Sequence, residues 1–150
     1  MKNILVSACL LGEDVRYNAE VVEVNDNIKR LTEQYKIIPV CPEVLGGLDV
    51  PREPCEIQGM SGSDVLDGKT SVLGNKGTDC TVAFILGSKK VLELARENNV
   101  EFAVLKERSP SCGSSIIYTG EFNGTTKPGE GVCTSLLRRH GIKVISENDI

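Results

Sequence analysis

The chain has no tryptophan, a single histidine and only 4% aromatic residues. It has no uninterrupted run of about 18 apolar residues, so no segment is predicted to cross a membrane. It also has no excess of basic residues, since 17 Lys and Arg stand against 21 Asp and Glu, a net charge of −4. This balance gives no reason to expect nucleic acid or an anionic membrane surface as a partner.

The shortage of histidine restricts nucleophilic chemistry, because a Cys–His pair would have to use His140. That residue directly precedes Gly141 at the end of a predicted helix, where an interaction with the helix dipole is enough to explain it. Chemistry of the cysteine-protease type is therefore not expected.

Cysteine, by contrast, is abundant, with six residues at positions 9, 41, 55, 80, 112 and 133. No two of them form a Cys-x-x-Cys pair, so neither a thioredoxin-type site nor a zinc knuckle has local support. The apolar segment before Cys9 runs only from Ile4 to Ala8 and is too short for a signal peptide. We expect a cytoplasmic protein whose cysteines remain thiols.

Apolar runs alternate with amphipathic segments along the 150 residues, a length that suits one domain over 1–150. This alternation predicts an α/β domain with a mainly parallel sheet and helices on both faces, but it does not fix the strand order. The expected strands are 3–8, 36–40, 101–105 and 142–146. The expected helices are 25–35, capped by Asn25; 78–98, capped by Thr78 or Asp79; and 131–141, ended by Gly141. The inner side of the longest helix is predicted to consist of Val82, Ile85, Leu86, Val91, Leu92 and Ala95.

Three segments are predicted from their loop-forming residues. The stretch 46–77 is rich in Gly, Pro, Ser and Asp and has no clear period, which indicates a long functional or mobile loop. Within it, "GSDVLDGKT" (62–70) has five residues between its glycines where a phosphate loop needs four, so we expect a loop there. "KPGEGV" (127–132) indicates a turn with a helix start, and its backbone N–H groups are an alternative anion site.

Cys9 and Cys41 directly follow the first two predicted strands, and Cys112 lies a few residues beyond the third. Sites in open parallel sheets form at the carboxyl ends of the strands, so these thiols can converge. Cys55, in the long loop, and Cys80 and Cys133, in first turns of helices, lack this placement. Each cysteine could be a small buried apolar residue. Three of them at strand ends favour a shared site.

Three thiolates suit some metal groups better than others. Zinc usually takes four ligands, and no histidine is nearby. An iron–sulfur cluster is usually held by four thiolates, so three would leave one iron open for Lewis-acid chemistry. Glu43, close to Cys41, could transfer protons, and Ser109 and Ser111 could position a substrate or donate hydrogen bonds.

The motifs "SACLLG", "RYN", "PVCPEVLGGLDVPREP", "LKERSPSCG", "IYTGEFNG" and "GEGV" resemble, in order, those of the DUF523 family, which includes the thiouracil desulfidases. The resemblance implies a Rossmann-like or flavodoxin-like domain. It also implies a [4Fe-4S] cluster with three cysteine ligands and one open iron that takes the substrate sulfur. Matched by motif, the ligands would be Cys9, Cys41 and Cys112. Glu43 would transfer protons beside a serine of "SPS", and Lys106 would orient the site. The implied reaction is non-redox: water replaces the sulfur of a small thiolated nucleobase such as thiouracil, and sulfide is released.

Two departures from the family pattern bear on this expectation. The chain reads "VRYN" (15–18) where many relatives read "CRYDG", and Cys55 stands where an alanine is common, so Cys55 could compete for iron. The exact substrate and the oligomeric state remain open. A non-catalytic module that binds metal or a cluster through the same cysteines is an alternative. A thiol-redox protein, with reversible disulfides and no iron, is a third hypothesis.

Overall fold

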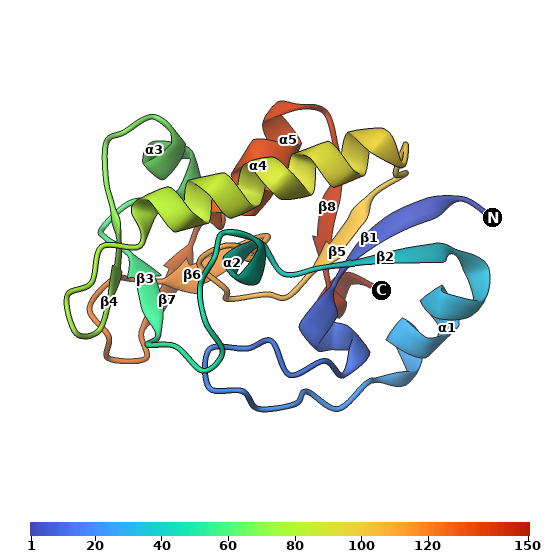
Figure 1. Ribbon diagram of the computed structural model, residues 1–150, viewed down its shortest axis with the longest axis horizontal. Helices are drawn as coiled ribbons and strands as arrows, with labels where there is room; N and C mark the ends of the chain where they lie inside the picture. The colour runs from blue at the N-terminus through green and yellow to red at the C-terminus, as the bar shows by residue number, and fades with distance from the viewer.

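The computed structural model describes all 150 residues, and its centre is a four-stranded parallel sheet. The strand order is β2-β1-β5-β8 (Figure 1). The strands are β1 (Asn3–Ser7), β2 (Lys36–Val40), β5 (Ala103–Leu105) and β8 (Val144–Ser146). The predicted parallel sheet is therefore confirmed.

Helices cover both faces of this sheet, as predicted. Leu5 faces the side covered by α4 (Thr81–Glu97) and α5 (Val132–Arg139), where it joins an apolar cluster with Val91 and Leu137. Ile4 points to the opposite side and packs with Ile28 of α1 (Asp26–Gln34). This alternation is the two-residue period of a strand that is buried on both faces.

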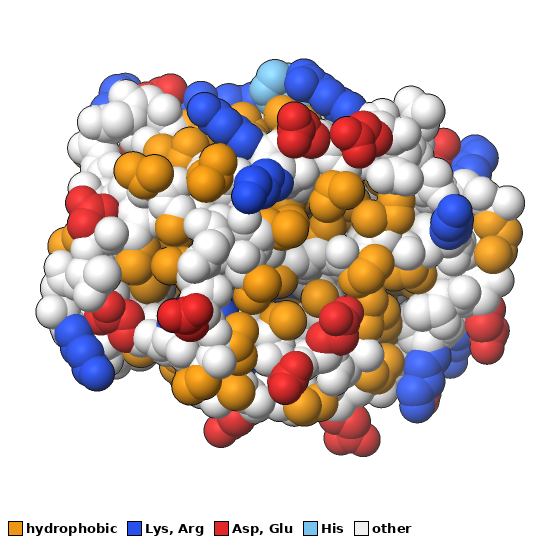
Figure 2. All heavy atoms as spheres, viewed as in Figure 1, with side chains coloured by type: hydrophobic (Ala, Val, Ile, Leu, Met, Phe, Trp, Pro, Cys, Tyr) orange, Lys and Arg blue, Asp and Glu red, His pale blue; other side chains and the backbone are white.

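Helix ends follow the predicted signals in two cases. Asn25 caps α1, because its side chain accepts a hydrogen bond from the backbone N–H of Ile28 at 2.8 Å. Gly141, at φ +79°, ends α5 in the left-handed conformation that glycine adopts without strain. His140 is the exposed C-cap of α5, and Figure 2 shows the single histidine, in pale blue, at the upper edge beside Lys and Arg side chains.

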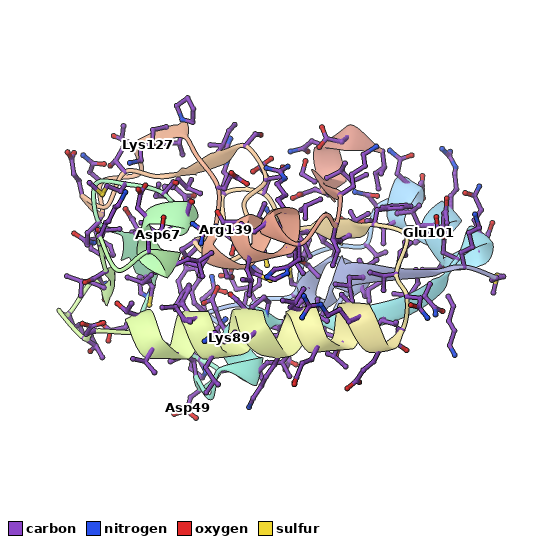
Figure 3. The ribbon with its side chains drawn as sticks, turned by 90° about the horizontal axis from the view of Figure 1, so that it is seen from above. Asp49, Asp67, Lys89, Glu101, Lys127 and Arg139 are labelled. Atoms are coloured by element: carbon purple, nitrogen blue, oxygen red, sulfur yellow. The ribbon has the colours of Figure 1, made fainter.

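The segment 46–77, predicted as an irregular loop, instead contains regular elements. It forms β3 (Cys55–Ile57), α3 (Gly62–Leu66) and β4 (Val72–Gly74), with β3 and β4 paired antiparallel. The loop assignment of 62–70 is therefore also wrong for α3, which a capping box at Ser61 and Asp64 begins. Asp67, just beyond α3, pairs with Arg139 of α5 at 3.0 Å (Figure 3). Elements of three to five residues are too short to show a hydrophobic period.

The predicted inner side of α4 is wrong at two positions, since Val82 is 78% exposed and Leu86 is 45% exposed. The buried stripe instead contains small residues among the apolar ones: Phe84, Gly87, Ser88, Val91, Leu92 and Ala95. Gly87 lies on this stripe because α2 (Pro42–Leu45) packs directly against it, and a Cβ there would collide with the Pro42 carbonyl oxygen. The helix also begins at Thr81, and the Asp79 carboxylate accepts from the Thr81 N–H at 2.9 Å.

Beside the parallel sheet lies a second pair of antiparallel strands, β6 (Ile116–Tyr118) and β7 (Thr126–Pro128), which the sequence did not predict. Two short 3₁₀ helices, η1 (Ala8–Leu11) and η2 (Glu147–Asp149), follow β1 and β8. Figure 1 shows the carboxyl ends of the parallel strands facing the small sheets, with α4 running along both parts. No helix has the length and apolar character needed to cross a membrane.

Candidate active site

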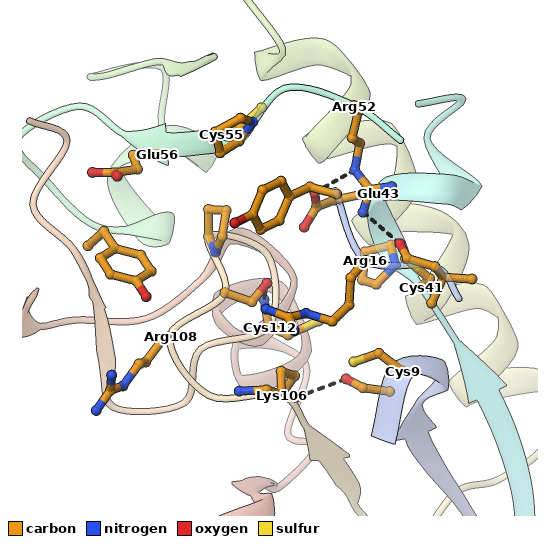
Figure 4. A pocket seen from close by; sticks show the side chains of 18 of the residues that line it. Cys9, Arg16, Cys41, Glu43, Arg52, Cys55, Glu56, Lys106, Arg108 and Cys112 are labelled. Atoms are coloured by element: carbon orange, nitrogen blue, oxygen red, sulfur yellow. Dashed lines mark hydrogen bonds and ion pairs between the residues drawn. The ribbon is translucent and has the colours of Figure 1, made fainter. Parts of the chain in front are cut away.

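A cavity of about 530 Å³ opens where the parallel strands end, and the small sheets form its other wall. Cys9 in η1, Cys41 between β2 and α2, and Cys112 in the loop after β5 all line it (Figure 4). The three strands that precede these cysteines, β1, β2 and β5, are neighbours in the sheet. The chain runs from β1 to β2 on one side of it, and later returns to add β5 on the other side of β1. Ligand sites of open α/β sheets form at such a reversal of strand order.

Burial makes the three thiols weak acids. It raises the pKa of Cys9 to about 11, although the nearby Lys106 and Arg16 charges oppose the shift. Burial likewise raises the pKa of Cys41, and it raises that of Cys112 well above its ordinary value. Binding a metal group here would therefore release protons.

The donor set fits a multi-atom metal group better than a single ion. No group of three His, Cys, Asp or Glu side chains in the structure could hold one metal ion, and the three thiols line one cavity. Soft sulfur donors around a cavity suit an iron–sulfur cluster, whereas a structural zinc site needs four ligands in contact with one ion.

The N-terminus of α5 fixes the backbone of the Cys112 loop. The N–H of Val132 donates to the Pro110 carbonyl at 2.9 Å, and the N–H of Cys133 donates to the Ser111 carbonyl at 2.8 Å. The Thr134 hydroxyl donates to the carbonyl of Cys112 at 2.9 Å. Because these donors are already used by the loop, "KPGEGV" is not an anion site. Its first two residues belong to the end of β7, and residues 129–132 form the predicted turn and helix start.

Two serines connect this loop to Glu43. Ser109 Oγ accepts hydrogen bonds from the N–H groups of Ser111 (3.2 Å) and Cys112 (3.1 Å), which holds the turn. Ser111 Oγ donates to Glu43 Oε2 at 2.8 Å and lies 2.9 Å from Ser109 Oγ. A carboxylate is the stronger acceptor for the one Ser111 proton, so Ser109 donates to Ser111. Ser109 lines the cavity, but Ser111 is only 1% exposed and lies behind the wall.

Arg52 holds the other oxygen of the Glu43 carboxylate. Its Nε donates to Glu43 Oε1 at 3.1 Å, and its Nη2 donates to the Val15 carbonyl at 2.9 Å (Figure 4). Glu43 stands in the first turn of α2, directly after Pro42, and faces the cavity. The sequence did not single out Arg52, although "PREP" lies within a motif that carries the family resemblance.

Lys106, predicted to orient the site, lies in the cavity wall with its Nζ 3.0 Å from Glu147 Oε2. Next to it, the buried Glu107 accepts hydrogen bonds from the N–H groups of Ser114 (2.8 Å), Ser115 and Ile116 (3.1 Å each). Burial by itself would raise the pKa of Glu107, but these hydrogen bonds outweigh it and lower the pKa to about 2. Glu107 therefore ties the Cys112 loop to β6, a role that sequence reasoning missed.

The remaining cysteines differ in their placement. Cys55 lies on β3, not in an irregular loop, and it also lines the cavity. Its Sγ is 3.5 Å from that of Cys80, the N-cap of α4. Cys133, in the first turn of α5, is fully buried in the main core. His140 is not part of the cavity wall, and its Nδ1 is 2.8 Å from Arg96 Nη2.

Comparison with known proteins gives three matches. The family 2-thiouracil desulfurase matches residues 4–149. The protein YbbK of Bacillus subtilis (strain 168) is 44% identical over 147 residues, which cover 98% of this chain and 97% of YbbK. The solved structure of the [4Fe-4S]-dependent thiouracil desulfidase TudS (DUF523Vcz) superimposes with a TM-score of 0.88 at 42% identity, covering 100% of this chain and 93% of TudS. These matches confirm the DUF523 resemblance: the chain belongs to the 2-thiouracil desulfurase family.

Proposed function

We propose that this thiouracil desulfidase-like enzyme replaces the sulfur of a thiolated pyrimidine, such as 2- or 4-thiouracil, by the oxygen of water. The thiocarbonyl and water give the carbonyl of uracil and hydrogen sulfide, with no electrons gained or lost. The observation that carries the proposal is the meeting of three strand-end thiols and a doubly held carboxylate, Glu43, at one cavity.

Cys9, Cys41 and Cys112 would hold a [4Fe-4S] cluster. Their placement at neighbouring strand ends, the softness of sulfur donors and the cofactor of the 42% identical TudS support this assignment. When bound, a cluster with three thiolate ligands supplies an open iron that acts as a Lewis acid toward sulfur. The Lys106 charge favours the thiolate form of Cys9, which gives this lysine a role in assembling the site.

Glu43 is the proposed proton-transfer group. As a carboxylate it accepts a proton from the attacking water, and it returns a proton as sulfur leaves. Arg52 and Ser111 hold its two oxygens, so the carboxylate cannot rotate away from the cavity. Ser109 takes part through Ser111, because its own proton is committed to that hydroxyl.

The cytoplasm is the proposed compartment. All six cysteines are free, and a reducing environment keeps them so.

The test is anaerobic reconstitution with iron and sulfide, followed by metal analysis and incubation with 2- and 4-thiouracil. The proposal expects about four irons per chain and release of sulfide together with uracil. Alanine substitutions of Cys9, Cys41 and Cys112 should each abolish both results. Four bound irons without turnover of any thiopyrimidine would instead favour a non-catalytic cluster protein.

A further inference from the structure

The few aromatic side chains of this chain are unevenly distributed. It has three Tyr and three Phe residues, and three of these line the single cavity described above: Tyr17, Tyr118 and Phe122. The others belong to the core: Phe84 is fully buried, and the rings of Tyr35 and Phe102 pack edge to face at 5.3 Å. The proposed function assigns no role to the three cavity aromatics.

Phe122 is held in an unfavourable backbone conformation. It lies in the turn between β6 and β7 with φ +55°, a left-handed value that a bulky side chain rarely adopts. Its side chain is nevertheless 37% exposed, so the strain is not explained by core packing. Strained backbone of this kind gathers at functional sites, where the surrounding structure enforces it.

Glu56 enforces this conformation from the neighbouring strand β3. Its carboxylate oxygen Oε1 accepts hydrogen bonds from the N–H groups of Gly120 (2.9 Å) and Phe122 (3.3 Å). Glu56 is only 8% exposed, and Figure 4 shows its carboxylate turned away from the thiols, toward the hairpin side of the cavity. The two hydrogen bonds to the buried Glu56 carboxylate hold the backbone of the β6–β7 turn, and they thereby fix the position of the Phe122 side chain.

We propose that Tyr118 and Phe122, together with Tyr17 of the segment 12–25 between η1 and α1, form a stacking seat for the flat ring of the substrate. Aromatic faces bind planar heterocycles by stacking and accept any base with a π-face. Aliphatic side chains would fill the same wall without this preference. The seat would select heteroaromatic thiocarbonyl compounds over acyclic ones. This inference rests on the proposed desulfidase function for its substrate and for the kinetic part of its test, but the measurement of uracil binding does not depend on that function.

The test uses the cluster-loaded enzyme and measures binding of uracil, the unreactive product, by calorimetry alongside KM and kcat for 2-thiouracil. Phe122→Gly and Tyr118→Ala should each raise the uracil Kd and the KM about tenfold, while kcat changes by less than about twofold. Phe122→Tyr should bind like the wild type. Glu121→Ala, an exposed change in the same turn and outside the cavity wall, is the matched control and should alter nothing.

Two further measurements distinguish substrate stacking by these aromatic rings from a purely structural role. Glycine adopts the left-handed φ of position 122 without strain, so Phe122→Gly should melt at or above the wild-type temperature. Thiourea, which carries the thiocarbonyl without a ring, should bind the wild type and Phe122→Gly equally. A lower melting temperature that parallels the loss of binding would assign these rings to the fold and overturn the seat.

Unchanged uracil binding in both variants, or no uracil binding by the wild type, would also overturn it. Uracil binding that depends on both rings, in an enzyme that desulfurates no thiopyrimidine, would support the seat while refuting the proposed function.

Discussion

Arg52 and Glu43 form an ion pair of 3.1 Å in which the two side chains are only 8% and 12% exposed. The pair joins the first turn of α2 to the loop before β3, and the second carboxylate oxygen is held by Ser111. A carboxylate that is held at both oxygens and faces a cavity keeps one orientation, and this orientation suits proton transfer to or from a molecule in the cavity.

Replacing Arg52 should therefore affect the rate and not the cluster. Arg52→Gln is expected to lower kcat by about 10- to 100-fold with unchanged iron content, because Glu43 loses the charged hydrogen bond from Arg52 Nε that orients it. Arg52→Lys should recover part of this loss, since it keeps the charge but not the planar geometry. Iron analysis and steady-state kinetics measure both effects, and Arg30→Gln, on the exposed side of α1, is the control. Loss of iron in Arg52→Gln would contradict a positioning role.

Glu43→Gln should separate cluster binding from catalysis more completely. The amide keeps the size of the side chain but cannot accept the proton of the attacking water, so kcat should fall by about 10²- to 10⁴-fold. The visible absorption of the cluster should match that of the wild type. Glu93→Gln, at an exposed position of α4, should leave both unchanged. Normal turnover by Glu43→Gln would refute the assigned role.

Cluster loading should improve as the pH rises. Burial raises the pKa of Cys9 to about 11 and that of Cys41 above its ordinary value, so both thiols are protonated in the empty protein at neutral pH. Thiolate ligation displaces these protons, and the affinity for the cluster must then increase with pH. Iron bound at limiting iron and sulfide, compared anaerobically between about pH 6.5 and 8.5, measures this. A flat or falling profile would argue against ligation by these thiols.

Glu107 should make folding sensitive to acid. Its pKa in the folded protein is about 2, below the ordinary 4.5, so its contribution to stability is complete above about pH 4.5 and is lost as the pH falls toward 2. Glu107→Gln should lower the free energy of unfolding, measured by urea titration at about pH 7, by about 2 kcal/mol. The reason is that charged hydrogen bonds to Ser114 and Ser115 are replaced by weaker ones. The variant should also lose less stability than the wild type between these pH values. Equal acid sensitivity of the two proteins would contradict this role.

Gly87→Ala should disturb the site from a distance. The added Cβ would collide with the Pro42 carbonyl, so α2 must move and take Glu43 with it. We expect a loss of about 2 kcal/mol or more in the free energy of unfolding, together with reduced kcat. Lys89→Ala, an exposed change on the same helix, should lie within about 0.5 kcal/mol of the wild type. A Gly87→Ala protein of normal stability would show that this close approach is not required.

The parallel sheet could be predicted because its buried strands are continuous aliphatic runs, and 36–40 was placed without error. The strands of the two small antiparallel sheets could not, because a strand such as β4 (Val72–Gly74) is shorter than any pattern that distinguishes strand from loop. The buried stripe of α4 was misplaced since its central members, Gly87 and Ser88, are small residues whose burial comes from close packing and not from hydrophobicity.

The candidate site also has a part that the sequence could predict and a part that it could not. The positions of Cys9, Cys41 and Cys112 follow from a rule about strand ends, which operates on the sequence of elements alone. The hydrogen bond from Ser111 to Glu43 joins residues 68 apart, and Arg52 comes from a segment without a recognisable pattern. Such contacts depend on how the loops fold back over the sheet, and local sequence does not encode that directly.

The most direct test of the account is the anaerobic conversion of 2-thiouracil in ¹⁸O-labelled water by the reconstituted enzyme, without any electron donor or acceptor. We expect uracil that carries one ¹⁸O atom, one sulfide for each uracil formed, and no conversion by Cys112→Ala. Unlabelled product, a requirement for a reductant, or full activity in the Cys112→Ala protein would contradict a hydrolytic desulfuration that depends on the three strand-end thiols.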